Sequence, residues 1–126
     1  MILIFGGAYQ GKLAYALERF NPADKDVHRC CDEDAEMPEG SIIIYEIDKW
    51  ILALIKAGAD ADEAVGRFIE ANRGAVVICN DISCGIVPAD PQMRQWREAT
   101  GRAMARIAAE SDEVIRLFCG IASRVK

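Results

Sequence analysis

The chain has 126 residues, a formal net charge of −5 and a hydrophobic fraction of 52%. This length suits one domain, and we expect a single folded domain over residues 1–126 rather than a disordered chain. The basic residues are scattered, which argues against a nucleic-acid partner. No apolar run has the length or the flanks of a signal peptide or a membrane span, so we expect a cytoplasmic protein without membrane contact.

The first half of the chain alternates apolar runs with amphipathic segments. The apolar run Met1–Phe5 predicts a strand buried on both faces. A helix is expected over Gly11–Phe20 and a short strand around Val27–Cys30. The acidic stretch 32–39 is interpreted as a solvated loop. The isoleucine-rich segment Ser41–Tyr45 predicts a second buried strand.

The second half continues this alternation. The expected elements are a helix at Ile47–Ala57, a helix at Ala61–Asn72, a buried strand at Ala75–Cys79, a helix from Pro91 to about Glu110, a strand at Glu113–Phe118 and a tail or edge strand at Gly120–Lys126. The long helix has a strong start signal, because Asp90 can cap it and Pro91 suits its first position. Strands that alternate with helices predict an α/β fold with a mostly parallel sheet and helices on both faces.

A glycine-rich segment follows the first strand and opens the first helix. It matches G-x-x-x-x-G-K, the pattern in which backbone N–H groups wrap a phosphate and the lysine reaches the β- and γ-phosphates. The candidate binding residues are Gly6, Gly7, Ala8, Tyr9, Gln10, Gly11, Lys12 and Leu13. We therefore predict a P-loop NTPase-like, three-layer fold that binds ATP or GTP. A strand-to-helix turn that binds nothing is the alternative.

The residue after the lysine departs from this pattern. A serine or threonine hydroxyl normally coordinates Mg²⁺ there, and Leu13 has no oxygen to offer. Mg²⁺ is therefore a doubtful cofactor. The five cysteines form no CxxC pair, so we assign no metal ligands and expect reduced thiols. The sequence suggests no role for the adjacent Cys30 and Cys31.

Several segments together resemble the adenosylcobinamide kinase/guanylyltransferase family. The opening MILIFGGAYQGK is similar to the family's first strand and phosphate loop. Trp50 resembles a tryptophan that follows a later strand, and VVICNDISCGIVP over residues 76–88 resembles a strand that leads into Gly-Ile-Val-Pro. The family's next helix carries an Arg–aromatic–Arg pattern, which Arg94 and Trp96–Arg97 resemble. Their order along the chain makes the combination more specific than any one motif.

The resemblance implies a role in cobalamin biosynthesis. Such enzymes phosphorylate the aminopropanol hydroxyl of adenosylcobinamide and then transfer GMP through a guanylylated histidine, often as cytosolic homo-oligomers. It therefore implies a nucleotide, a corrinoid and a second copy of the chain as partners. Two departures stand against full activity. Tyr45 replaces an acidic residue at the end of a strand, and the segment that carries the family's histidine is missing. We do not assign that role to His28, and we expect guanylyl transfer to be lost.

Lys12, Asp81 and Glu46 are the candidate catalytic residues. Asp81 follows the third buried strand and could orient Mg²⁺-bound water or the substrate hydroxyl, or it could be a capping residue of the loop. Glu46 could replace the missing acidic residue, although neighbouring side chains on a strand point in opposite directions. The leading interpretation is a nucleotide-binding protein that is a kinase if it is active. A non-catalytic regulatory or partner subunit and a kinase for another small alcohol remain open.

Overall fold

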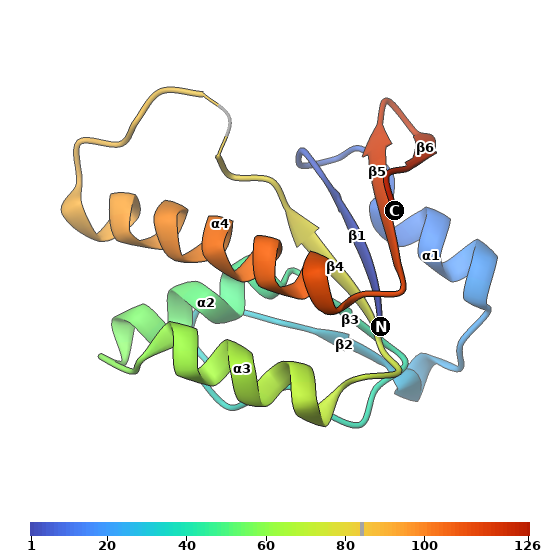
Figure 1. The fold of residues 1–126 in the computed structure, drawn as a ribbon, viewed down its shortest axis with the longest axis horizontal. Helices are drawn as coiled ribbons and strands as arrows, with labels where there is room; N and C mark the ends of the chain where they lie inside the picture. The colour runs from blue at the N-terminus through green and yellow to red at the C-terminus, as the bar shows by residue number, and fades with distance from the viewer. Residues whose placement is uncertain (84) are drawn as a thin grey trace.

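The computed structural model describes residues 1–83 and 85–126, and its elements follow the predicted order (Figure 1). The strands are β1 (Ile2–Gly6), β2 (Val27–Arg29), β3 (Ile43–Tyr45), β4 (Val76–Asn80), β5 (Glu113–Phe118) and β6 (Ile121–Arg124). The helices are α1 (Lys12–Phe20), the short 3-10 helix η1 (Asp24–Asp26), α2 (Ile47–Lys56), α3 (Ala61–Ala71) and α4 (Pro91–Glu110). Among these described residues, no helix is long and apolar enough to span a membrane.

One six-stranded sheet, ordered β2-β3-β4-β1-β5-β6, organises the molecule. All neighbouring strands are parallel except β6, which runs antiparallel to β5. The mostly parallel P-loop-like α/β fold predicted from the sequence is therefore confirmed. Because β4 lies between β1 and β3, residues after these three strands meet at the same carboxyl edge.

Helices cover both faces of the sheet. The larger core lies under α2, α3 and α4, where Trp50, Phe68 and Ile107 are almost fully buried. Trp50 and Phe68 pack with ring centroids 5.4 Å apart. The smaller core lies on the α1 side, where Ala16 packs against β-strand residues such as Ile4. In three-layer folds of this kind, ligands generally bind at the carboxyl edge of the sheet.

Most element boundaries agree with the predictions to within one or two residues. The β3 strand begins at Ile43 rather than Ser41, and the C-terminal segment forms the edge strand β6. The prediction of a solvated loop for the acidic residues of the stretch 32–39 is confirmed. Its acidic side chains are largely exposed, but Ala35 and Met37 pack against the larger core, and the Ala35 carbonyl accepts a hydrogen bond from Trp50 Nε1. These sparse apolar residues were the sequence signal that part of the stretch packs against the core.

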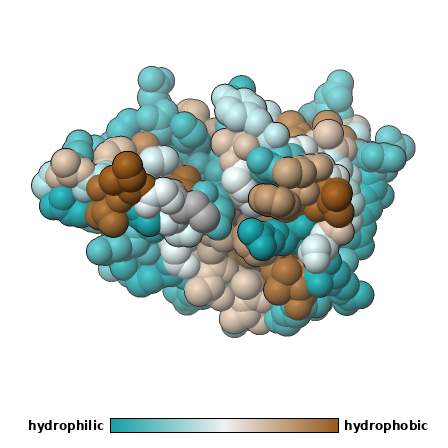
Figure 2. All heavy atoms as spheres, turned by 90° about the horizontal axis from the view of Figure 1, so that it is seen from above, coloured by the Kyte–Doolittle hydropathy of each residue, from teal (hydrophilic) through white to brown (hydrophobic). Residues whose placement is uncertain are grey.

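Three connections meet at the carboxyl edge of the sheet, namely the loop after β1, the loop after β4 and the β5–β6 turn (Figure 1). Figure 2 looks onto this edge and shows apolar side chains in separate groups among hydrophilic ones. The exposed large apolar residues at these connections are Tyr9, Ile86, Val87, Phe118 and Ile121.

Candidate functional site

The glycine loop after β1 adopts a wrapped conformation that needs positive φ angles. Tyr9 has φ 58° and Gly11 has φ 87°, and Gly11 is the N-cap of α1. A non-glycine residue rarely adopts φ near 60°, so Tyr9 marks a strained turn of the kind that gathers at ligand sites. This backbone turns the chain from β1 into α1 within five residues, 7–11.

Lys12 is folded back over this loop. Its side chain is buried, with 6% relative exposure, and Nζ donates a hydrogen bond to the carbonyl oxygen of Gly7 at 2.5 Å. Burial lowers the pKa of Lys12, while the carboxylate of Asp48 acts in the opposite direction. An ammonium held at the mouth of a loop by one carbonyl can exchange that contact for a phosphate oxygen.

Gln10 ties the loop to the β5–β6 turn. The backbone N–H of Cys119 donates to Gln10 Oε1, and the N–H of Gly120 donates to the Gln10 carbonyl oxygen at 3.2 Å. Gln10 therefore holds the loop against the β5–β6 turn, a role that the motif alone does not reveal.

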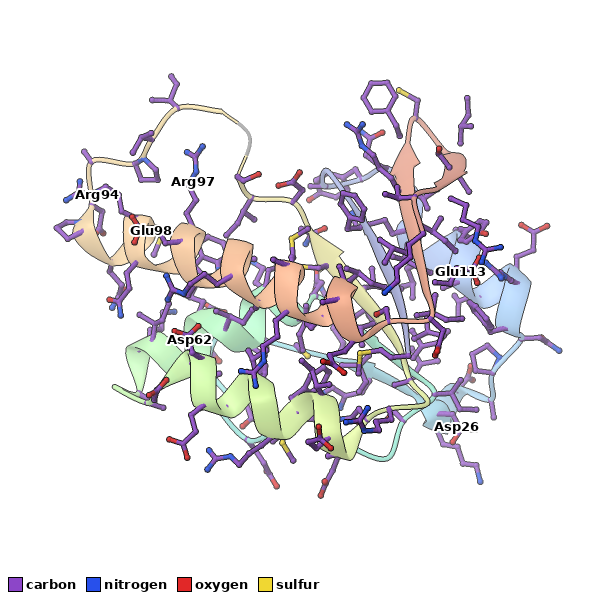
Figure 3. All side chains as sticks on the ribbon, in the orientation of Figure 1. Asp26, Asp62, Arg94, Arg97, Glu98 and Glu113 are labelled. Carbon is purple, nitrogen blue, oxygen red and sulfur yellow. The ribbon has the colours of Figure 1, made fainter. Side chains whose placement is uncertain are left out.

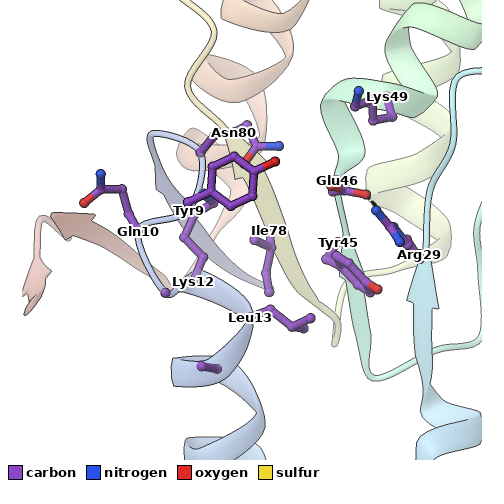
Figure 4. A pocket seen from close by; sticks show the side chains of 13 residues that line it. Tyr9, Gln10, Lys12, Leu13, Arg29, Tyr45, Glu46, Lys49, Ile78 and Asn80 are labelled. Atoms are coloured by element: carbon purple, nitrogen blue, oxygen red, sulfur yellow. Dashed lines mark hydrogen bonds and ion pairs between the residues drawn. The ribbon is translucent and has the colours of Figure 1, made fainter. Parts of the chain in front are cut away.

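A pocket of about 380 Å³ lies beside the loop, at the carboxyl ends of β2, β3 and β4 (Figure 4). Its lining residues are Ala8, Tyr9, Gln10, Gly11, Lys12, Leu13, Ala14, Arg29, Tyr45, Glu46, Lys49, Ile78 and Asn80. Six of the eight predicted binding residues line it. Gly6 and Gly7 do not; Gly6 forms the end of β1, and Gly7 supplies the carbonyl that Lys12 binds. The volume is within the range of small-molecule sites.

The wall opposite the loop carries an ion pair. Arg29, at the end of β2, donates from Nε to Glu46 Oε2 at 2.7 Å, and its guanidinium lies 6.0 Å from the ring centroid of Tyr45. Glu46 has φ 59° and forms the N-cap of α2, so it leaves the strand geometry that made its direction ambiguous. Lys12 and Glu46 thus lie on opposite walls of one pocket.

Sequence reasoning missed Asp48, the buried carboxylate next to this site. Asp48 is 1% exposed in the first turn of α2 and accepts hydrogen bonds from Asn80, through the backbone N at 3.0 Å and Nδ2 at 3.2 Å. Burial raises the pKa of Asp48, and the hydrogen bonds from Asn80 oppose that shift. The available signal was a lone carboxylate within the apolar run Ile47–Ile55. Its position joins α2 to the end of β4.

Asp81 lies apart from the loop pocket. Its backbone N–H donates to the Gly6 carbonyl at 2.9 Å, and its carboxylate accepts from Ser83 N and Oγ. It lines a second pocket of about 180 Å³ together with Thr100, whose buried Oγ1 has no hydrogen-bond partner in the described part of the chain. The structure therefore brings Lys12 and Glu46 together but does not place Asp81 with them.

Two arginines of α4 donate hydrogen bonds to the backbone of the loop after β4. Arg94 donates to the carbonyls of Pro88 and Ala89, and Arg97 points from α4 towards the loop and donates to Ser83 and Ile86 (Figure 3). Neither arginine lines the loop pocket. These contacts fit a structural role for both.

His28 and the cysteines that the structure describes, namely Cys30, Cys31, Cys79 and Cys119, do not line the loop pocket. His28 is exposed on β2 and lines two small pockets with Asp34 and Glu36. Burial raises the pKa of the Cys30 thiol to about 12, which leaves it protonated and unreactive at neutral pH. The structure suggests no chemistry for Cys31 beside it.

The donor atoms near the loop do not fit Mg²⁺. Leu13 offers no oxygen, Glu46 is paired with Arg29, and both carboxylate oxygens of Asp48 accept from Asn80. Within residues 1–83 and 85–126, no group of three His, Cys, Asp or Glu side chains could hold a metal ion. Mg²⁺ in such loops is usually held by a hydroxyl and a carboxylate in addition to the phosphates.

A family model described as "Cobinamide kinase / cobinamide phosphate guanyltransferase" matches residues 23–125. The chain belongs to this family. One curated relative is the bifunctional adenosylcobalamin biosynthesis protein CobU of Salmonella typhimurium strain LT2, which is 37% identical over 51 residues. The aligned segment covers 40% of this chain but only 28% of that protein.

The family match confirms the resemblance seen in the sequence. The matched range begins at residue 23, after the glycine loop and α1. A phosphate site at the loop is therefore supported by the motif, the loop conformation and the pocket beside it, and not by the family match.

Proposed function

We propose that this family member binds the phosphates of ATP or GTP in the pocket between the glycine loop and the Arg29–Glu46 wall. The observation that carries the proposal is the geometry of Lys12. Among the described residues, its Nζ donates a hydrogen bond to the Gly7 carbonyl oxygen alone, and this contact holds it at the loop. Loop amides, the N-terminus of α1 and this ammonium together favour a polyphosphate anion.

As a kinase, the protein would transfer a phosphoryl group to a hydroxyl of a corrinoid such as cobinamide. The bond from the γ-phosphorus to the bridging oxygen breaks, a bond to the acceptor oxygen forms, and the hydroxyl proton needs a base. Glu46 is the one carboxylate among the residues that line the pocket, so we assign it that role. Lys12 neutralises the developing charge on the phosphates.

A second candidate function is a non-catalytic nucleotide-binding subunit. Leu13 and the engagement of Glu46 by Arg29 favour it, because they remove a metal ligand and occupy the proposed base. Guanylyl transfer is not part of either proposal, since no histidine lines the pocket.

Calorimetric titration of ATP and of GTP tests the binding proposal. The change of Lys12→Ala should weaken binding at least tenfold, because a charge-assisted contact to phosphate contributes about 1.5–3 kcal/mol. Lys25→Ala removes the same charge from the exposed helix η1 and serves as the matched control. Equal affinity of the Lys12 and Lys25 variants would refute the loop site.

Turnover then separates the two candidates. Formation of ADP or GDP that depends on added cobinamide, and that is lost in Glu46→Gln, supports the kinase. Nucleotide binding without such turnover supports the non-catalytic subunit.

A further inference from the structure

The loop pocket is positively charged within an acidic protein. Its lining holds three cationic side chains, Lys12, Arg29 and Lys49, and one carboxylate, Glu46. The whole chain carries a net charge of −5. A local excess of positive charge in a concave site attracts anions of high charge density.

Two of these cations lie where the phosphate loop itself does not reach. Arg29 comes from the end of β2 and Lys49 from the first turns of α2, and both lie on the wall that faces the loop across the pocket (Figure 4). An anion held by the loop amides and Lys12 would present its far oxygens to this wall.

Arg29 is oriented for that contact. Among the described residues its hydrogen bonding involves Nε alone, which donates to Glu46, and the ring of Tyr45 lies near the guanidinium. The two terminal nitrogens remain able to donate to phosphate oxygens in the two-pronged geometry that guanidinium favours. Glu46 thus holds Arg29 in place and also competes with a phosphate for it.

The same pocket lacks the donors that Mg²⁺ requires. Leu13 stands at the hydroxyl position, Glu46 is paired, and Asp48 is turned to Asn80. Negative charge on bound phosphates must then be neutralised by protein cations.

We propose that the pocket binds the nucleotide triphosphate without a divalent cation, with Arg29 and Lys49 supplying the charge that Mg²⁺ supplies in related phosphate loops. This inference rests on the proposed nucleotide binding at the loop. It assigns a binding role to Arg29 and Lys49 on the opposite wall, and neither residue belongs to the glycine motif.

Calorimetry with ATP, GTP and inorganic tripolyphosphate tests the proposal, with each titration run in EDTA and again in excess Mg²⁺. We expect the affinity in EDTA to equal or exceed that in Mg²⁺, because Mg²⁺ neutralises the ligand charge that the wall recognises. Arg29→Gln and Lys49→Gln should each weaken binding in EDTA about tenfold. Arg29→Lys should recover only part of this loss, because ammonium lacks the planar fork.

Two further variants sharpen the result. Glu46→Gln should strengthen binding in EDTA a few-fold, because it releases Arg29 and removes the one carboxylate of the lining. Lys25→Gln is the matched control for charge and should leave the affinity within about twofold of the parent, since this exposed charge precedes β2, at the opposite end of the strand from the pocket residue Arg29, and is screened. Circular dichroism of each variant establishes that it is folded.

The failures of the two proposals are distinguishable. A tenfold gain of affinity on adding Mg²⁺, or full affinity in Arg29→Gln and Lys49→Gln, overturns the metal-independent wall while a loss in Lys12→Ala still supports the loop site. Absence of any effect in Lys12→Ala overturns the loop site itself.

Discussion

The loops after β1 and after β4 leave the same edge of the sheet from neighbouring strands, yet they are built differently. The loop after β1 is fixed by its own backbone turns and by Gln10, and it leaves a pocket and a lysine beside it. The loop after β4 is held by arginines of α4, which donate hydrogen bonds to its carbonyl oxygens. Within this loop the Asp81 carboxylate accepts a hydrogen bond from Ser83 N. The comparison shows that a strand's carboxyl end brings residues to the ligand edge but does not decide which of them face a ligand.

The largest contrast between the two loops is expected from alanine at their glycines. A Cβ at Gly6 would overlap the carbonyl oxygen of Leu117, whereas a Cβ at Gly85 meets nothing within 4 Å among the described residues. Gly6→Ala should lower the free energy of unfolding by about 3 kcal/mol through overpacking. Gly85→Ala has only a positive φ of 98° to accommodate and should cost about 1 kcal/mol. Urea denaturation measures both, and equal losses would contradict the tight join between β1 and β5.

The next largest difference in stability is expected between variants of two carboxylates that follow central strands, Asp48 after β3 and Asp81 after β4. Asp48→Ala leaves the partly buried N–H of Asn80 without its acceptor, which should cost about 2 kcal/mol. Asp81→Ala removes an acceptor from Ser83 N and Oγ at an exposed position, where water can replace it, so a smaller loss is expected. Thermal or urea unfolding of the two variants side by side measures the difference. A larger loss in Asp81→Ala would show that the loop after β4, not the α2 start, secures this edge.

A third contrast concerns how each loop is held. Gln10→Ala removes the acceptor for the Cys119 N–H and should weaken ATP binding about threefold by loosening the phosphate loop. Arg97→Ala loosens the loop after β4, and none of the described residues 81–83 and 85–90 lines the pocket, so the ATP affinity of this variant should stay within about twofold of the parent. Calorimetry in EDTA reports both values. An equal loss in the two variants would mean that the loops act as one unit.

Much of this arrangement could be read from the sequence because it depends on local patterns. Buried strands appear as continuous apolar runs, and Asp90-Pro91 marks the start of α4, where the Asp90 side chain accepts from Gln92 N. The phosphate loop is likewise a contiguous motif. Each of these features is specified by residues that are neighbours in the chain.

The opposite wall could not be predicted in the same way. Arg29 and Glu46 are separated by 17 positions and meet only because β2 pairs with β3 in a particular register. The positive φ of Glu46, which redirects its side chain, has no signature in a residue type that rarely adopts it. The sequence analysis grouped Asp81 with Lys12 and Glu46 because all three follow strands that end at the same edge of the sheet. The direction of the Asp81 side chain, however, depends on the loop that follows β4, which the sequence does not specify.

The smallest expected effect is a change of ATP affinity with pH in the loop after β1. Burial lowers the pKa of Lys12 below its usual value of 10.5, so its charge, and the phosphate contact that needs it, is present below that lowered pKa and is lost as the pH rises through it. The unfolded chain binds that proton more tightly, so the free energy of unfolding should rise over the same interval while the affinity falls. Titrations in EDTA from neutral to alkaline pH should show a decline that is absent from Lys12→Ala. A decline of equal size in that variant would show that the titration does not belong to Lys12.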